Sequence, residues 1–192
     1  MKKRSSEFLN AMAAYDADDE TLALALMEQC AKSGDPSACF LAALWYRDGV
    51  GAPASPDRSA HWLTRFQELA ENGDVEAQWQ LGQHFRFGNL LPLDIARANY
   101  WLERAAEGGH GEAQHHLAWF YERGQYGYPV DKEAAESWYQ SAFKLENPET
   151  IYLFALRQFN DGRPTDSALE LLRKAGDLGF GQANDVLQSI TH

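Results

Sequence analysis

The side chains with the clearest binding chemistry in this chain are arginines and tryptophans that recur at similar places. Arg47, Arg86 and Arg123 stand near the ends of three related stretches, and Trp79 and Trp119 lie inside two of them. A guanidinium group pairs bidentately with a carboxylate, and an indole ring contributes a large contact area to a binding surface. These residue types predict a groove that binds an extended or helical protein segment with a carboxylate or an acidic run.

A second set of polar residues raises the alternative of a metal-dependent enzyme. Glu112 and His116 are spaced i, i+4 on one helical face, His110 and His115 are near them, and His84 could approach from an earlier helix. However, adjacent histidines diverge by roughly 100° around a helix, and the chain has no HExxH motif. We therefore predict no metal, no other cofactor, no catalytic residue and no small-molecule substrate, so that the chain is not an enzyme.

Composition narrows the class of partner. The chain has 192 residues, 45% hydrophobic content and a formal net charge of -11, which disfavours nucleic acid and anionic membrane surfaces. No apolar run reaches the length of a membrane span. Acidic residues Glu7 and Asp16 interrupt the N-terminal region, so we expect no export signal. With only two cysteines, a reducing, cytoplasmic setting is the expectation.

The elements that must position these side chains are helices in a repeat. Glycines close four similar stretches at intervals of 39, 36 and 38 residues, a period typical of helical-hairpin solenoids. Between them lie second helices with large residues at one position, preceded three residues earlier by a small residue, and we assign the tryptophans there to the core. The closing glycines are Gly49, Gly88, Gly124 and Gly162, and the second-helix pairs are Trp62-Leu63, Trp101-Leu102, Trp138-Tyr139 and Leu171-Leu172.

The period predicts the organisation of the whole chain. We expect a single domain with a partial unit at residues 5–33, full units at 34–72, 73–108, 109–145 and 146–178, and a cap at 179–192. The fold class is all-α: a right-handed α-solenoid of about five helix-turn-helix repeats with a C-terminal capping helix. Helix starts are expected at residues that accept hydrogen bonds from backbone N–H groups. These are Asp35, Ser55, Asp94, Asp131, Asn147 and Thr165.

The repeat also resembles a known family. The pattern A-x-x-x-L-G-x-x-F/Y-x-x-G, followed after a loop by A-x-x-W-L/Y-x-x-A/S-A/F, resembles the Sel-one-like repeat family, which is related to the tetratricopeptide repeat. The resemblance covers nearly all of the chain from Leu22 to Ala183. It implies a protein-interaction scaffold without catalytic machinery of its own. Some family members have a disulfide at the junction occupied here by Cys30 and Cys39, but we expect buried free thiols.

The resemblance implies which residues line a binding groove. In tetratricopeptide geometry the first helices face a concave surface, and we expect the positions outside the packing stripe to point into it. The alternative is that the aromatics close the core while the arginines neutralise Asp48, Glu122 and Asp161. The predicted groove residues are Phe40, Leu44, Arg47, Trp79, Gln83, Arg86, His115, Trp119, Arg123, Leu153 and Arg157.

These observations favour an adaptor that binds a protein or peptide partner in the groove. A second hypothesis is an inhibitory, immunity or regulatory protein whose acidic surface neutralises a basic partner. The third is the metal-dependent enzyme described above.

Overall fold

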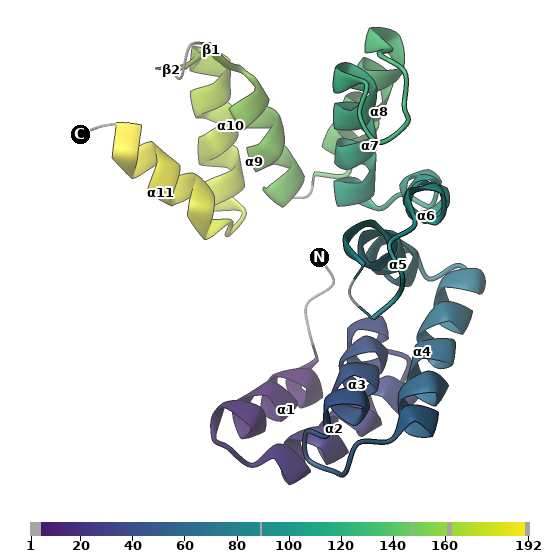
Figure 1. The fold of residues 1–192 in the computed structure, drawn as a ribbon. Coiled ribbons are helices and arrows are strands. Elements are labelled where there is room, and N and C mark those ends of the chain that lie inside the picture. The colour runs from purple at the N-terminus through teal and green to yellow at the C-terminus, as the bar shows by residue number, and fades with distance from the viewer. Residues whose placement is uncertain (1–4, 89, 147, 161–162, 191–192) are drawn as a thin grey trace. The chain divides into compact units, whose positions relative to one another are not determined.

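The structure is a computed structural model that describes residues 5–88, 90–146, 148–160 and 163–190. The chain divides into two compact units, Met1–Trp101 and Leu102–His192. Within the described residues there are eleven helices and one two-stranded sheet (Figure 1). Every helix in these ranges is too short or too polar to cross a bilayer.

The first unit is built from consecutive antiparallel helices. Neighbours in sequence pack against each other from the first helix to the fifth (Figure 1). The division between the units falls within the sixth helix. In chain order the helices are α1 (Ser6–Asp16), α2 (Glu20–Lys32), α3 (Pro36–Asp48), α4 (Pro56–Glu71), α5 (Val75–Phe87) and α6 (Ile95–Glu107).

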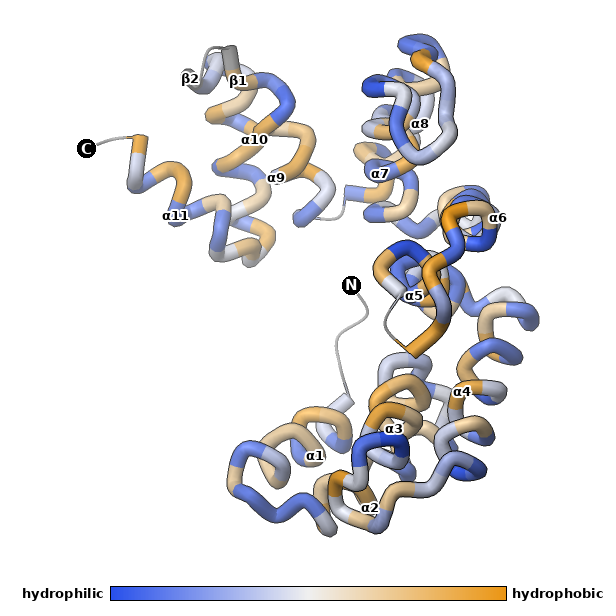
Figure 2. The backbone as a smooth tube through the Cα atoms, viewed as in Figure 1, coloured by the Kyte–Doolittle hydropathy of each residue, from blue (hydrophilic) through white to orange (hydrophobic). Residues whose placement is uncertain are grey.

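The second unit continues the same pattern of helix pairs. Its first two helices pack together, the next two form a second pair, and the last helix packs on that pair. The elements are α7 (Gly111–Arg123), α8 (Lys132–Lys144), α9 (Pro148–Arg157), β1 (Phe159–Asn160), β2 (Arg163–Pro164), α10 (Asp166–Asp177) and α11 (Gly181–Ile190). Hydrophobic and hydrophilic residues alternate along the helices of both units, as amphipathic packing requires (Figure 2). The predicted all-α solenoid of helix hairpins is confirmed.

The helix ends follow the expected chemistry. Gly49, Gly88 and Gly124 adopt left-handed φ angles of 78°, 68° and 64° directly after α3, α5 and α7, where a residue with a Cβ would be strained. Gly162 and the predicted cap Asn147 lie outside the described residues. The confirmed N-terminal caps are Asp35, Ser55, Asp94, Asp131 and Thr165.

A repeated contact joins the end of one helix to the start of the next. In three successive junctions a side chain donates to the penultimate carbonyl of the preceding helix, eight residues earlier in the chain. This carbonyl lies in the last turn of its helix and accepts from the backbone N–H of a glycine just beyond it, and the side chain adds a second donor. The three contacts are Cys39 Sγ to Ala31 O at 3.6 Å, Gln78 Nε2 to Ala70 O at 2.9 Å, and Gln114 Nε2 to Ala106 O at 2.9 Å.

Both cysteines are buried free thiols, as expected from the composition. The disulfide that the resemblance allows is therefore not formed. Burial raises the pKa of both thiols, and that of Cys39 reaches about 12. A thiol with a pKa this high stays protonated at neutral pH and reacts slowly.

The division of tryptophans between core and groove is partly wrong. Trp62 is 4% exposed and belongs to the core, as predicted, whereas Trp101 and Trp138 are only partly buried, each against the core of its own unit. Trp79, predicted to face the groove, is only 8% exposed. Phe40, at the equivalent place in the preceding pair, is buried as well, with its ring against Phe66 of α4 and His84 of α5.

The last repeat also departs from its prediction. The closing glycine Gly162 predicts a first helix that continues almost to that residue, but α9 ends at Arg157. Phe159 instead starts β1, where it pairs with Pro164 of β2. A short antiparallel pair thus replaces the predicted end of this helix and leads into α10.

Candidate functional site

A cavity of about 570 Å³ lies within the second unit, among α7, α8 and α9. Five of the predicted groove residues line it, and four further residues complete the wall. The predicted members are His115, Trp119, Arg123, Leu153 and Arg157, and the others are Glu122, Tyr139, Leu156 and Phe159.

Helical spacing explains how these side chains come to share one wall. On α7 they are spaced i, i+4, i+7 and i+8, so they share one face of the helix. On α9, Leu153, Leu156 and Arg157 follow the i, i+3, i+4 pattern on the opposing wall. Tyr139 comes from α8, the partner of α7. The cavity therefore combines three helices that belong to two successive hairpins.

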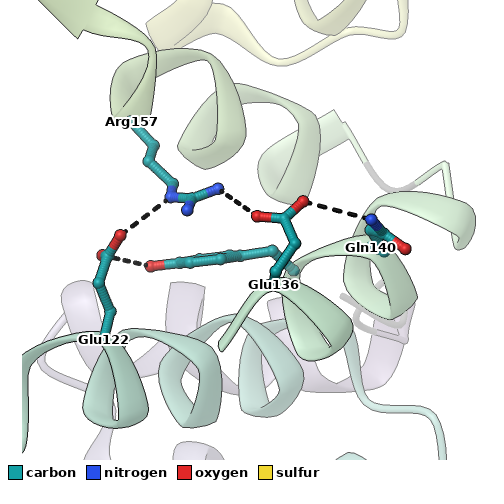
Figure 3. A network of polar contacts seen from close by, with 5 residues as sticks. Glu122, Glu136, Gln140 and Arg157 are labelled. Carbon is teal, nitrogen blue, oxygen red and sulfur yellow. Dashed lines mark hydrogen bonds and ion pairs between the residues drawn. The ribbon is translucent and has the colours of Figure 1, made fainter. Parts of the chain in front are cut away.

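Arg157 is held by a cluster of polar and aromatic groups, which we call the Arg157 cluster (Arg157, Glu122, Glu136 and Tyr139). Its Nε lies 3.2 Å from Oε1 of Glu122 and its Nη1 lies 3.3 Å from Oε2 of Glu136 (Figure 3). The guanidinium also lies 4.0 Å above the centre of the Tyr139 ring. The Tyr139 hydroxyl donates to the second oxygen of Glu122 at 3.0 Å. Arg157 thus contacts two carboxylates and the Tyr139 ring, and the centre of the Phe154 ring lies 6.0 Å from its guanidinium.

The Arg123 guanidinium makes different contacts from that of Arg157. Its guanidinium lies 5.2 Å from the centre of the Trp119 ring, a cation–π contact. Within the part of the chain that the structure describes, Arg123 forms no ion pair. Glu122, expected to neutralise a neighbouring arginine, pairs with Arg157 instead. Arg123 is therefore the cation of this cavity that can bind an anionic group.

His115 contributes a neutral ring to the cavity. Burial is the main cause that lowers its pKa to about 4, and the nearby Arg157 acts in the same direction. Its ring packs edge-on to Tyr139, with ring centres 5.3 Å apart. At neutral pH the imidazole is uncharged, so it adds no positive charge for a ligand. No group of three or more histidine, cysteine or acidic side chains is placed to hold a metal ion among the described residues.

The remaining predicted groove residues belong to the first unit and differ in exposure. Phe40 is 7% exposed and stacks on His84 of α5 at 3.4 Å between ring centres. Arg86, predicted at a rim, is 6% exposed. A guanidinium is buried only with polar partners, so we assign Arg86 to the packing of this unit. The others are Leu44 and Gln83, which are half-buried, Arg47, which pairs with Asp48 at 2.7 Å, and the buried Trp79.

Sequence reasoning missed four residues of the cavity wall. Glu122 could have been found, because it lies seven residues after His115 on the same face of α7. Tyr139 follows Trp138 in the repeated second-helix pair, and its ring is buried. Its hydroxyl reaches the cavity, which the repeat pattern does not indicate. The positions of Leu156 and Phe159 in the cavity wall depend on the residue at which α9 ends.

Removing the Tyr139 hydroxyl should weaken the Arg157 cluster. We expect Tyr139→Phe to lower the free energy of unfolding by about 1–2 kcal/mol, because Glu122 loses a donor in a partly buried place. Urea unfolding followed by circular dichroism measures this. Tyr15→Phe is the control: that exposed ring stacks on Trp45, and its change should stay below about 0.5 kcal/mol. Equal losses in both variants would contradict the role given to the Tyr139 hydroxyl.

Comparison with known proteins places this chain among repeat proteins. The Sel1 repeat model matches residues 36–73, 75–110, 111–147 and 165–180, more than half of the chain. An uncharacterized protein of Neisseria meningitidis is 32% identical over 128 residues, which is 66% of this chain and 25% of that protein. A chitin synthase regulator of Saccharomyces cerevisiae is 34% identical over 138 residues, 69% of this chain and 19% of that protein. The chain thus spans a quarter or less of these curated relatives.

Two solved structures share the fold. A Sel1 repeat protein from Oxalobacter formigenes has a TM-score of 0.59 and 28% identity, over 89% of this chain and 49% of that one. A protective antigen of uropathogenic Escherichia coli has a TM-score of 0.56 and 26% identity, over 88% and 37% respectively. Together with the repeat matches and the helix hairpins described above, these similarities show that the chain belongs to the Sel1 repeat family, whose members are protein-interaction scaffolds.

Proposed function

We propose that this chain is an adaptor that binds a segment of a partner protein in the cavity of its second unit. The observation that supports this most directly is the pairing of Trp119 with an arginine that forms no ion pair among the described residues, beside the apolar wall of Leu153. Aromatic and arginine side chains are the groups most enriched at energetically important interface positions. The residues of the first unit that were predicted to line the groove remain part of the proposal only where they are exposed.

The Arg157 cluster gives the cavity a defined shape before a partner arrives. It connects α7, α8 and α9 through one guanidinium, with contacts to Glu122, Glu136 and Tyr139. A wall that is already ordered loses less conformational entropy when a segment binds. Binding energy can then come from contacts with Trp119 and Arg123.

The relatives support a role in binding instead of catalysis. Relatives named as chitin synthase regulators match this chain over 13% and 19% of their lengths. The proposal therefore includes that the chain regulates the protein it binds. The net charge of -11 supports a protein partner over nucleic acid or an anionic membrane surface. Two buried free thiols suit a reducing, cytoplasmic setting.

Trp119→Ala should remove partner binding while leaving the fold intact. Trp119 is half-buried, so truncation deletes contact area at the cavity without opening the core. Affinity capture from native lysate followed by quantitative mass spectrometry measures recovery of partners. We expect at least a tenfold loss relative to wild type.

The matched control is Tyr100→Ala, which removes an aromatic ring that is 51% exposed on α6 of the first unit. It should recover the same partners as wild type. If Trp119→Ala and wild type recover partners equally, with both folded by circular dichroism, the cavity is not the binding site.

A further inference from the structure

We propose that the occupant of the cavity is an internal peptide segment with one aspartate or glutamate side chain that binds Arg123, next to a large apolar side chain that packs on Trp119. This inference rests on the proposed function and specifies its partner. It follows from the charges, the backbone and the apolar surface of the cavity.

The distribution of charge selects a single carboxylate over an acidic run. Of the two arginines at the cavity, Arg157 is already bound by Glu122 and Glu136. These two carboxylates would repel a second acid on the ligand that approached Arg157. Only Arg123 remains to be neutralised, and one carboxylate does this. The alternative of an acidic run, left open by the sequence, is therefore disfavoured.

The backbone around the cavity favours a side-chain carboxylate over the carboxylate at a chain end. Capture of a terminal carboxylate typically uses several free backbone N–H groups that point into the site. Here His115, Trp119 and Arg123 lie within α7, and Leu153 and Arg157 lie within α9. Beyond the first turn of each helix the N–H groups bond to carbonyls of their own helix. The guanidinium fork of Arg123 is then the main donor, and it matches a carboxylate bidentately.

The apolar surface defines the neighbour of the acid. Trp119 lies under the Arg123 guanidinium, and Leu153, Leu156 and Phe159 complete an apolar wall in the same cavity. His115 is neutral and adds no competing charge. A large apolar side chain adjacent to the acid would cover Trp119 while the carboxylate binds Arg123. Covering the ring removes water from the ion pair and strengthens it.

Selection from a peptide display library tests this inference directly. The probe is a library of random twelve-residue peptides, each fused at its C-terminus to the display protein so that no terminal carboxylate is present. Selection uses the full chain, with Trp119→Ala for counter-selection. We expect enriched peptides with one Asp or Glu at a fixed spacing from a large apolar residue. Synthetic versions should bind Arg123→Ala at least about tenfold more weakly than wild type.

Two further variants refine the result. Arg123→Glu should select Lys or Arg in place of the acid, and Arg123→Lys should bind more weakly than wild type because it lacks the planar fork. Arg65→Ala is the control, since that exposed arginine pairs with Glu68 on α4 of the first unit. It should bind the enriched peptides as wild type does.

The outcomes separate this inference from the function on which it rests. Enriched peptides without a preferred acid, or with runs of acids, would overturn the inference while leaving a peptide-binding cavity. Peptides that bind Arg123→Ala as tightly as wild type would do the same. If no peptide is enriched on the wild-type chain relative to Trp119→Ala, both the inference and the proposed function fail.

Discussion

Replacing Phe66 by alanine should lower the free energy of unfolding by about 3–5 kcal/mol, the usual cost of deleting a buried aromatic ring. The Phe66 side chain is 0% exposed on α4. Its ring packs edge-on against Phe40 of α3 and His84 of α5, with centres 5.7 and 5.8 Å apart. Removing it leaves a void at the junction of three helices, and neighbouring helices cannot close the gap without losing their own packing.

Phe87→Ala provides a matched control for this prediction. Phe87 also lies on a helix of the first unit but is 65% exposed, so the same substitution should change stability by less than about 0.5 kcal/mol. Urea unfolding followed by both circular dichroism and tryptophan fluorescence measures the two variants. Similar losses at Phe66 and Phe87 would contradict the assignment of the first-unit core.

Acidification should destabilise the fold through two histidines, one in each unit. Burial lowers the pKa of His84 and of His115 to about 4, from an ordinary value of 6.5. As pH falls below 6.5 the unfolded chain binds protons first, so stability is lost progressively and the loss is complete near pH 4. By linkage, each histidine should contribute a loss of about 2 kcal/mol between pH 7 and pH 5, and about 3 kcal/mol in full.

Unfolding free energies measured from pH 7.5 to 4.5 test this directly. His84→Phe keeps an aromatic ring against Phe40 but removes the proton-binding group, so the dependence on pH should become shallower. His61→Phe is the control, because His61 is exposed on α4, and it should keep the wild-type profile. A wild-type stability that stays constant over this range would contradict the neutral state assigned to both half-buried rings.

The fold was predictable because single residue types mark where its helices begin and end. Glycines such as Gly49 and Gly88 are required where the chain takes a left-handed conformation, and Asp35 and Asp94 are suited to the first turn of a helix. These requirements are local. They recur with the period of the helix hairpin, so spacing alone indicates where most of these helices begin and end, α9 being the exception.

The candidate site was less predictable, because the exposure of each side chain depends on which neighbouring helix covers it. Trp79 on α5 and Trp119 on α7 lie at neighbouring positions of equivalent helices. Trp79 is nevertheless buried, whereas Trp119 is half-buried at the cavity. The pairing of Arg157 with Glu136 connects residues 21 positions apart on different helices. Periodicity shows that a position repeats, but not which charge another hairpin places opposite it.

The contacts that join each helix end to the next helix have a consequence for how this architecture can grow. Donor and acceptor are only eight residues apart, as in Gln78 with Ala70 and Gln114 with Ala106. Each hairpin begins with the donor of one joint and ends with the acceptor of the next, so duplicating or deleting a whole hairpin leaves every joint with both partners. Array length can thus change by modular insertion, in evolution or by engineering, without compensating substitutions in the flanking repeats.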